Sequence, residues 1–185
     1  MWRRPLTAWL VEQGAVVTAM DVSPEMIRLA RARVADRATL YVADLNDGLR
    51  FSADHSYDVV VASLVLHYVE EWERVLVSLR RVLRERGVVV FSTHHPTLDW
   101  ELHSRESYFA VKQVTETWHK GSRPFEVTFW RRPLTAMAEA IAAAGFVIER
   151  LVEPQPLPEM RDRHPDVYEK LRTRPWFLFF RIVVA

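Results

Sequence analysis

The sequence contains no cysteine and unusually little glycine. Its 185 residues include 5 glycines, whereas an average usage of about 7 % would give roughly 13. The absence of cysteine excludes disulfides and cysteine-ligated metals, and it is typical of a cytoplasmic protein. The shortage of glycine leaves no glycine-rich loop for a nucleotide cofactor, because the first glycine, Gly14, stands where a helix would end.

Long apolar runs and an excess of one charge are also missing. No apolar run approaches the length of about 18 residues that a membrane helix needs, and the first residues lack the apolar region of a signal peptide. The 25 basic and 24 acidic residues are interspersed and give a net charge of +1. We therefore expect neither a membrane nor a nucleic acid as partner. A chain of 185 residues is expected to form one domain.

The segment Ala15–Val34 predicts a buried strand, a turn and a helix. The apolar run Ala15–Met20 is short and rich in valine, and Asp21 stands where this strand would end. Ser23 is a suitable N-cap and Pro24 suits the first helical position. In doubly wound α/β folds an acidic residue at the end of the second strand binds the hydroxyls of a nucleoside ribose. Asp21 therefore predicts a nucleoside cofactor.

Strands and helices alternate through the first hundred residues. The hydrophobic pattern and the helix-end signals predict helices at Pro5–Gln13, Pro24–Val34 and Glu71–Arg84, and strands at Ala15–Met20, Thr39–Val42, Tyr57–Ala62 and Val88–Thr93. We expect Gly87 to close the third of these helices. Such alternation is typical of crossover units that build a parallel sheet.

The pattern changes after residue 96. Thr97–Trp130 is longer and aromatic, and its partial alternation around Lys120–Pro124 predicts a β-hairpin or lid. The remaining elements are predicted as a helix at Pro133–Ala144, a strand at Phe146–Val152, a short helix near Asp166–Arg172 and a last strand at Trp176–Val184.

Four segments together resemble one family. They are VVTAMDVSPEMIRLAR from Val16, VADLND from Val42, SYDVVVASLVLHYVEEWERVLVSLRRVLRERGVVVFS from Ser56, and RRPLTAMAEAIAAAGFVIERLVEP from Arg131. In this order and spacing they resemble the class I S-adenosylmethionine-dependent methyltransferases of the small-molecule, type 11-like kind. The resemblance implies a three-layer, doubly wound α/β sheet of the Rossmann-like methyltransferase fold with a C-terminal antiparallel strand pair. It also implies one methyltransferase-like domain over residues 1–185, with 97–130 as a substrate-lid insertion.

The chain departs from this family at its beginning. The family's first strand, which is central in the sheet, and its glycine-rich turn come directly before the helix that begins here near Pro5. Loss of a central strand leaves unpaired backbone on both neighbouring strands and costs several kcal/mol. We therefore expect the first central strand to be missing from this chain and the working protein to be longer. A start codon assigned too late, a fragment and a decayed gene would all produce this sequence.

The resemblance implies S-adenosylmethionine as cofactor and six residues that bind it. Asp21 accepts hydrogen bonds from the ribose, and a plain helix cap is the alternative for this residue. Asp44 meets the adenine, and an ordinary turn acid is the alternative there. The full set is Asp21 and Val22, Asp44 and Leu45, and Ser63 and Leu64, of which the last pair is expected at the methionine end of the cofactor.

Three histidines are candidate general bases. His67 follows the predicted strand Tyr57–Ala62, and His94 and His95 follow Val88–Thr93. All three are therefore expected at the edge of the sheet where ligands bind, and imidazole suits base chemistry at neutral pH. Contacts to backbone or substrate without proton transfer are the alternative.

A metal site is not expected. Adjacent histidines of a strand point to opposite faces, and no carboxylate stands at ligand spacing from His94 and His95 or from the later His103 and His119.

The predicted function is transfer of a methyl group from S-adenosylmethionine to a small organic acceptor. A non-catalytic partner of the same fold, or a truncated gene product that no longer binds the cofactor, remains open because the glycine-rich turn is missing. A nicotinamide dehydrogenase built on Asp21 is disfavoured, because its GxGxxG turn is missing too and the chain ends in paired strands. Nothing in Thr97–Trp130 distinguishes an oxygen, nitrogen or carbon acceptor, and the oligomeric state is equally undecided.

Overall fold

The computed structural model describes residues 6–103, 106–120 and 123–185. The chain forms two compact units, residues 1–48 and 49–185. Among the described residues, no helix is long and apolar enough to cross a membrane.

The first unit is built from alternating helices and strands. Its elements are α1 (Leu6–Glu12), β1 (Val17–Asp21), α2 (Pro24–Val34), β2 (Ala38–Val42) and the short 3-10 helix η1 (Leu45–Asp47). β1 and β2 pair in parallel with Asp21 opposite Val42, so both strands end at the same edge. The Ser23 hydroxyl accepts a hydrogen bond from the Met26 N–H at 3.3 Å and caps α2, which confirms the predicted helix start.

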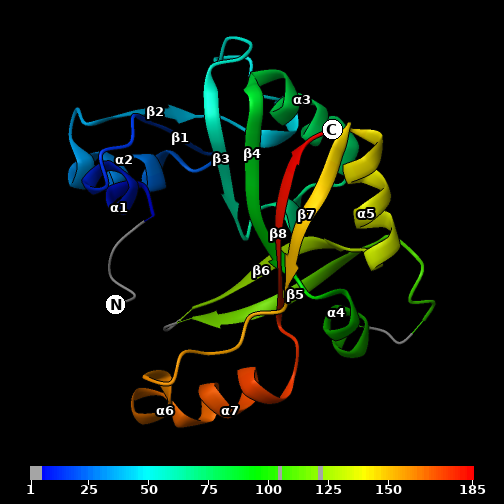
Figure 1. Ribbon diagram of the computed structural model, residues 1–185. Coiled ribbons are helices and arrows are strands. Elements are labelled where there is room, and N and C mark those ends of the chain that lie inside the picture. The colour runs from blue at the N-terminus through cyan, green and yellow to red at the C-terminus, as the bar shows by residue number, and fades with distance from the viewer. Residues whose placement is uncertain (1–5, 104–105, 121–122) are drawn as a thin grey trace. The chain divides into compact units, whose positions relative to one another are not determined.

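The second unit contains a four-stranded sheet in the order β3-β4-β8-β7. Its strands are β3 (Tyr57–Ser63), β4 (Leu83–His94), β7 (Phe146–Val152) and β8 (Phe177–Val184). β3 and β4 run parallel, and β8 lies antiparallel between β4 and β7 (Figure 1). The predicted C-terminal antiparallel pair is thus confirmed. Within the described part of the chain, β3 pairs on one side only, and the missing central strand stays a prediction.

Helices and an aromatic core complete this unit. The other elements are η2 (Leu66–Tyr68), α3 (Trp72–Val82), α4 (Pro96–Leu102), β5 (Lys112–Lys120), β6 (Arg123–Arg131), α5 (Leu134–Ala143), α6 (Met160–Arg163) and α7 (Pro165–Thr173). β5 and β6 form the predicted antiparallel hairpin. The rings of Phe91 and Phe180 stack at 4.7 Å, and Trp72 meets Phe91 edge-on at 5.6 Å. These rings lie in the core between α3 and the sheet.

The end of α3 differs from the sequence prediction. The predicted helix extends to Arg84 with the next strand starting at residue 88, but α3 ends at Val82 and β4 starts at Leu83. Leu83 pairs with Tyr57 and is 1 % exposed, so packing of this side chain against the sheet outweighs the helical pattern. A Cβ on Gly87 would lie 2.8 Å from the Arg84 carbonyl oxygen, so the close approach of the backbone requires glycine at this position.

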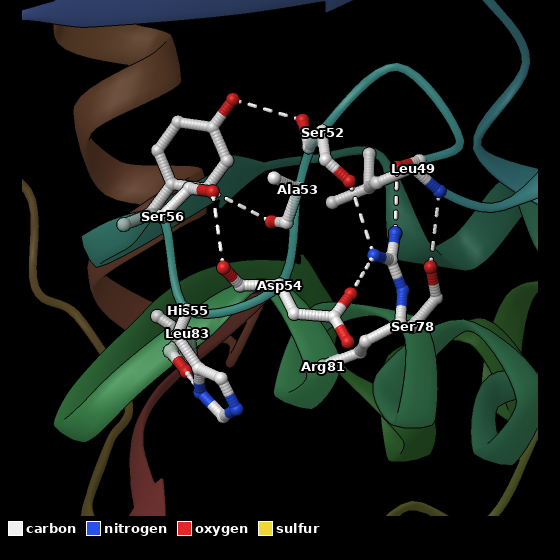
Figure 2. A network of polar contacts seen from close by, with 10 residues as sticks. Leu49, Ser52, Ala53, Asp54, His55, Ser56, Ser78, Arg81 and Leu83 are labelled. Carbon is white, nitrogen blue, oxygen red and sulfur yellow. Dashed lines mark hydrogen bonds and ion pairs between the residues drawn. The ribbon is translucent and has the colours of Figure 1, made fainter.

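A polar network ties the segment before β3 to α3 (Figure 2). The Arg81 guanidinium donates hydrogen bonds to the Leu49 carbonyl at 2.7 Å, to the Ser52 carbonyl at 3.0 Å and to the Asp54 carboxylate. His55 Nδ1 lies 2.9 Å from the Leu83 carbonyl. One arginine of α3 thus holds a segment that has no secondary-structure ladder of its own.

Candidate functional site

Asp21 lies at the carboxyl end of β1 and belongs to the turn that opens α2. Its Oδ1 accepts a hydrogen bond from the Ser23 N–H at 2.8 Å, and its backbone carbonyl accepts one from the Ala43 N–H at 3.1 Å. Oδ2 has no hydrogen bond within the described residues, and Val22 beside it is 66 % exposed. One carboxylate oxygen of Asp21 therefore fixes the turn.

Asp44 has the same arrangement after β2. Its Oδ1 accepts hydrogen bonds from the Asn46 N–H at 2.8 Å and from the Asn46 side-chain amide at 2.9 Å. It therefore caps η1, where Leu45 is the first residue. Because β1 and β2 are parallel and paired, the Asp21 and Asp44 turns lie at one edge of this unit.

In the second unit, Ser63 ends β3 and Leu64 follows it with a strained backbone. Leu64 has a φ of +51°, a left-handed conformation that is uncommon for a branched aliphatic residue. Its N–H donates to both the carbonyl and the hydroxyl of Ser92 at 3.1 Å, and the Ser63 and Ser92 hydroxyls lie 3.5 Å apart. β4 thus holds the turn after β3 in its strained form.

The structure brings His67 and His94 together at the ends of β3 and β4. Their rings stack at 4.0 Å with 15° between the planes. His67 is 3 % exposed, and its Nδ1 has no hydrogen-bond partner among the described residues. Burial, the nearby His94 and then Arg132 lower the pKa of His67 to about 3. His67 is therefore neutral at physiological pH and a poor proton acceptor.

The carboxylate of Asp99 lies next to the His94 ring. Its Nδ1 lies 3.4 Å from Asp99 Oδ1, which is longer than an ordinary hydrogen bond, and its side chain is 17 % exposed. A carboxylate at this place favours the tautomer that carries its proton on Nδ1. Nε2 then keeps its lone pair, and it makes no hydrogen bond within the described chain. This arrangement is the one that a general base requires.

His95 has a different role, because both of its ring nitrogens have partners. Nδ1 accepts a hydrogen bond from the Thr97 N–H at 3.3 Å and so caps α4. Nε2 must then carry the proton, and it lies 2.9 Å from Glu153 Oε1. His95 thus has no free lone pair in this structure.

Sequence reasoning considered His103 only as a metal ligand, yet it lies in the same cluster. His67, His94 and His103 meet the ring of Phe129 edge-on at 6.2, 5.1 and 5.4 Å. His103 Nδ1 lies 2.9 Å from the Asp99 carbonyl oxygen, and Nε2 contacts the Glu116 carboxylate. The spacing of Asp99 and His103, four residues apart, would have indicated a shared helix face had α4 been predicted. No group of side chains in the described ranges could hold a metal ion.

Arg132 and Trp72 hold the turn that carries His67. Arg132 is 5 % exposed, lies with its guanidinium 4.7 Å from the centre of the Trp72 ring, and donates to the Val69 carbonyl. Trp72 Nε1 donates to the Leu66 carbonyl at 2.8 Å. Burial lowers the pKa of Arg132 to about 10, which leaves it charged at neutral pH. The stacked pair therefore fixes the carbonyls on both sides of His67.

Comparison with known proteins relates the chain to methyltransferases. Residues 5–91 match the family model described as a methyltransferase domain. A crystal structure of a putative S-adenosylmethionine-dependent methyltransferase from Listeria monocytogenes has a TM-score of 0.76 at 25 % identity, over 96 % of this chain and 84 % of that one.

Two enzymes of known reaction are also similar. A malonyl-[acyl-carrier protein] O-methyltransferase from Halalkalibacterium halodurans is 25 % identical over 71 % of this chain. The thiol S-methyltransferase TMT1B from Homo sapiens is 36 % identical over 57 % of this chain. The alignments span 52 % and 43 % of the length of these two enzymes. The methyltransferase-domain match over residues 5–91 and the Rossmann-like fold of the structural neighbours support a class I methyltransferase with S-adenosylmethionine as cofactor.

Proposed function

We propose that this protein transfers a methyl group from S-adenosylmethionine to a small organic acceptor that loses a proton in the reaction, with His94 as general base. The observation that carries this proposal is the free Nε2 of His94, backed by the Asp99 carboxylate 3.4 Å from Nδ1. Hydrogen bonds of catalytic histidines are often long in free enzymes and tighten when the substrate binds.

We assign the nucleoside part of the cofactor to residues of the first unit. Asp21 keeps one carboxylate oxygen without a hydrogen bond in the described residues, and Val22 and Leu45 lie in the turns beside the two aspartates. Asp21 would bind the ribose hydroxyls, and Asp44 with Leu45 would bind the adenine. In the second unit, Ser63 and the strained Leu64 stay our candidates for the methionine end.

The cofactor, when bound, supplies an electrophilic methyl group on a sulfonium ion. The residues of this chain would orient the acceptor and accept its proton at His94 Nε2. His67 stacks on His94 but stays neutral, because burial, His94 and Arg132 lower its pKa to about 3. It can therefore hold the His94 ring in place without competing for the proton.

The two enzymes of known reaction support an acceptor with a heteroatom. One is named for methylation on oxygen and the other for methylation on sulfur. The second candidate is a methyltransferase-fold partner that binds no cofactor. A cytoplasmic location stays a prediction.

Thermal unfolding of the full chain with and without S-adenosylhomocysteine separates these two candidates. Ligand at about 100 times its dissociation constant adds roughly 2.7 kcal/mol, which is about 5–10 °C for a chain of this size. A shift of that order supports a cofactor-binding enzyme, and transfer of labelled methyl groups to thiols and carboxylic acids then tests the acceptor. A cooperative transition that does not move supports the non-catalytic partner.

A further inference from the structure

Both ring nitrogens of His103 face hydrogen-bond acceptors. Nδ1 lies 2.9 Å from the Asp99 carbonyl oxygen, and Nε2 contacts a carboxylate oxygen of Glu116. A carbonyl oxygen and an ionised carboxylate accept hydrogen bonds and cannot donate them, so each ring nitrogen must carry a proton. His103 is therefore an imidazolium ion paired with Glu116.

The state of Glu116 agrees with this assignment. Burial by itself raises the pKa of Glu116, but hydrogen bonds from His103 and Trp118 outweigh burial and bring the pKa below its usual range. Trp118 Nε1 donates to Oε2 at 2.7 Å, while His103 contacts Oε1. Each carboxylate oxygen thus has its own donor, as a stable ionised carboxylate requires.

This ion pair joins α4 to the hairpin of β5 and β6. His103 directly follows α4, and Glu116 lies in the middle of β5. Their side chains are 12 % and 32 % exposed. The pairing fastens the last turn of α4 to the hairpin of β5 and β6, and it is shielded enough from water to be stronger than a surface ion pair.

The same turn of α4 carries the aspartate behind the candidate base. Asp99 accepts the His103 Nδ1–H with its backbone carbonyl and directs its carboxylate toward His94 Nδ1 at 3.4 Å. The ionisable groups around His103 are therefore Glu116 from β5, Asp99 from α4 and His94 from β4.

We propose that His103 and Glu116 are positioning residues for His94. As an imidazolium–carboxylate pair they fix the last turn of α4, and this turn sets the Asp99 carboxylate opposite Nδ1 of His94. His94 consequently keeps its proton on Nδ1 and its lone pair on Nε2. The catalytic meaning of this arrangement rests on the proposed function, but the tautomer of His94 is a property of the free protein.

Nuclear magnetic resonance of the histidine rings tests the proposal without any acceptor. The full chain, labelled with ¹⁵N, is recorded as wild type and as Glu116→Gln, and ¹H–¹⁵N correlations within each ring report which nitrogens carry protons. In the wild type we expect both ring nitrogens of His103 to carry protons and neutral His94 to favour Nδ1–H. In Glu116→Gln we expect the ratio of Nδ1–H to Nε2–H in His94 to fall roughly fivefold, as loss of one hydrogen bond of ordinary strength would produce.

Glu153→Gln is the matched control, because it removes the carboxylate from His95 in the same way. It should leave the tautomer of His94 unchanged. His103→Gln removes the other partner of the His103–Glu116 pair. It should lower the ratio of Nδ1–H to Nε2–H in His94 as Glu116→Gln does. The proposal is overturned if His103 is singly protonated in the wild type, or if neither His103→Gln nor Glu116→Gln changes the His94 ratio. A failure of methyl transfer would refute the proposed function and leave these ring spectra as they are.

Discussion

Replacement of Arg81 by methionine should destabilise the second unit far more than loss of an ordinary surface ion pair. Arg81 donates to the Leu49 and Ser52 carbonyls at 2.7 and 3.0 Å, and both of these residues are less than 9 % exposed. Each carbonyl that is buried and loses its donor costs about 1–2 kcal/mol. The ion pair between Arg81 and Asp54 adds little to the stability, because the two side chains are 38 % and 62 % exposed. We therefore expect a loss of about 3 kcal/mol in the free energy of unfolding.

Arg84→Met is the control for this prediction. Arg84 pairs with both carboxylate oxygens of Asp58 at 2.8 and 2.9 Å, but the two side chains are 54 % and 76 % exposed and no carbonyl is involved. Its loss should cost less than about 1 kcal/mol. Thermal unfolding followed by tryptophan fluorescence should lower the melting temperature by roughly 6–12 °C in Arg81→Met and by no more than about 4 °C in Arg84→Met. Equal shifts in the two variants would refute the reasoning that the carbonyls carry the stability.

Three further predictions concern the candidate site. Asp21→Ala should weaken binding of S-adenosylhomocysteine about tenfold or more in calorimetry, since a charge-assisted hydrogen bond is lost, whereas Asp36→Ala, an exposed acid of the same unit, should not. His94→Gln should lower methyl transfer about 100-fold or more with unchanged affinity for S-adenosylhomocysteine, and a base elsewhere is indicated if the rate is kept. The pKa of His67 is about 3 in the folded protein, chiefly through burial, and about 6.5 when unfolded. The unfolded chain therefore binds the extra proton between these values, and stability falls as the pH drops through this window. Urea unfolding should show a loss of about 2 kcal/mol from pH 7 to pH 5 that His67→Gln abolishes.

The fold was largely predictable from local signals. α2 has the predicted bounds Pro24–Val34 because Ser23, Pro24 and the apolar spacing agree, and β7 has the predicted bounds Phe146–Val152 because Gly145 stops the preceding helix. Where a local pattern and a tertiary contact disagreed, the contact decided. Leu83 continues the apolar stripe of α3 but pairs with Tyr57 instead.

The helix α4 could not be predicted by the same reasoning. Its seven residues PTLDWEL are too few to show a helical period, and its cap is a histidine ring instead of one of the usual Ser, Thr, Asp or Asn side chains. Missing α4 meant that Asp99 and His103 could not be placed on one helix beside His94. The identity of the aspartate behind the candidate base was therefore hidden from the sequence.

Four histidines of one unit have different chemistry because their neighbours differ. His67 is neutral through burial, His95 has both nitrogens engaged, and both nitrogens of His103 face acceptors. Only for His94, among these four, does the described structure combine an orienting carboxylate on one nitrogen with a free lone pair on the other. A residue type that is common at neutral-pH active sites thus identifies a base only after its partners are known. These partners come from β4, α4 and β5. If α4 no longer packs against the hairpin, His94 should therefore lose its orienting carboxylate and resemble the other histidines while the sheet is still folded.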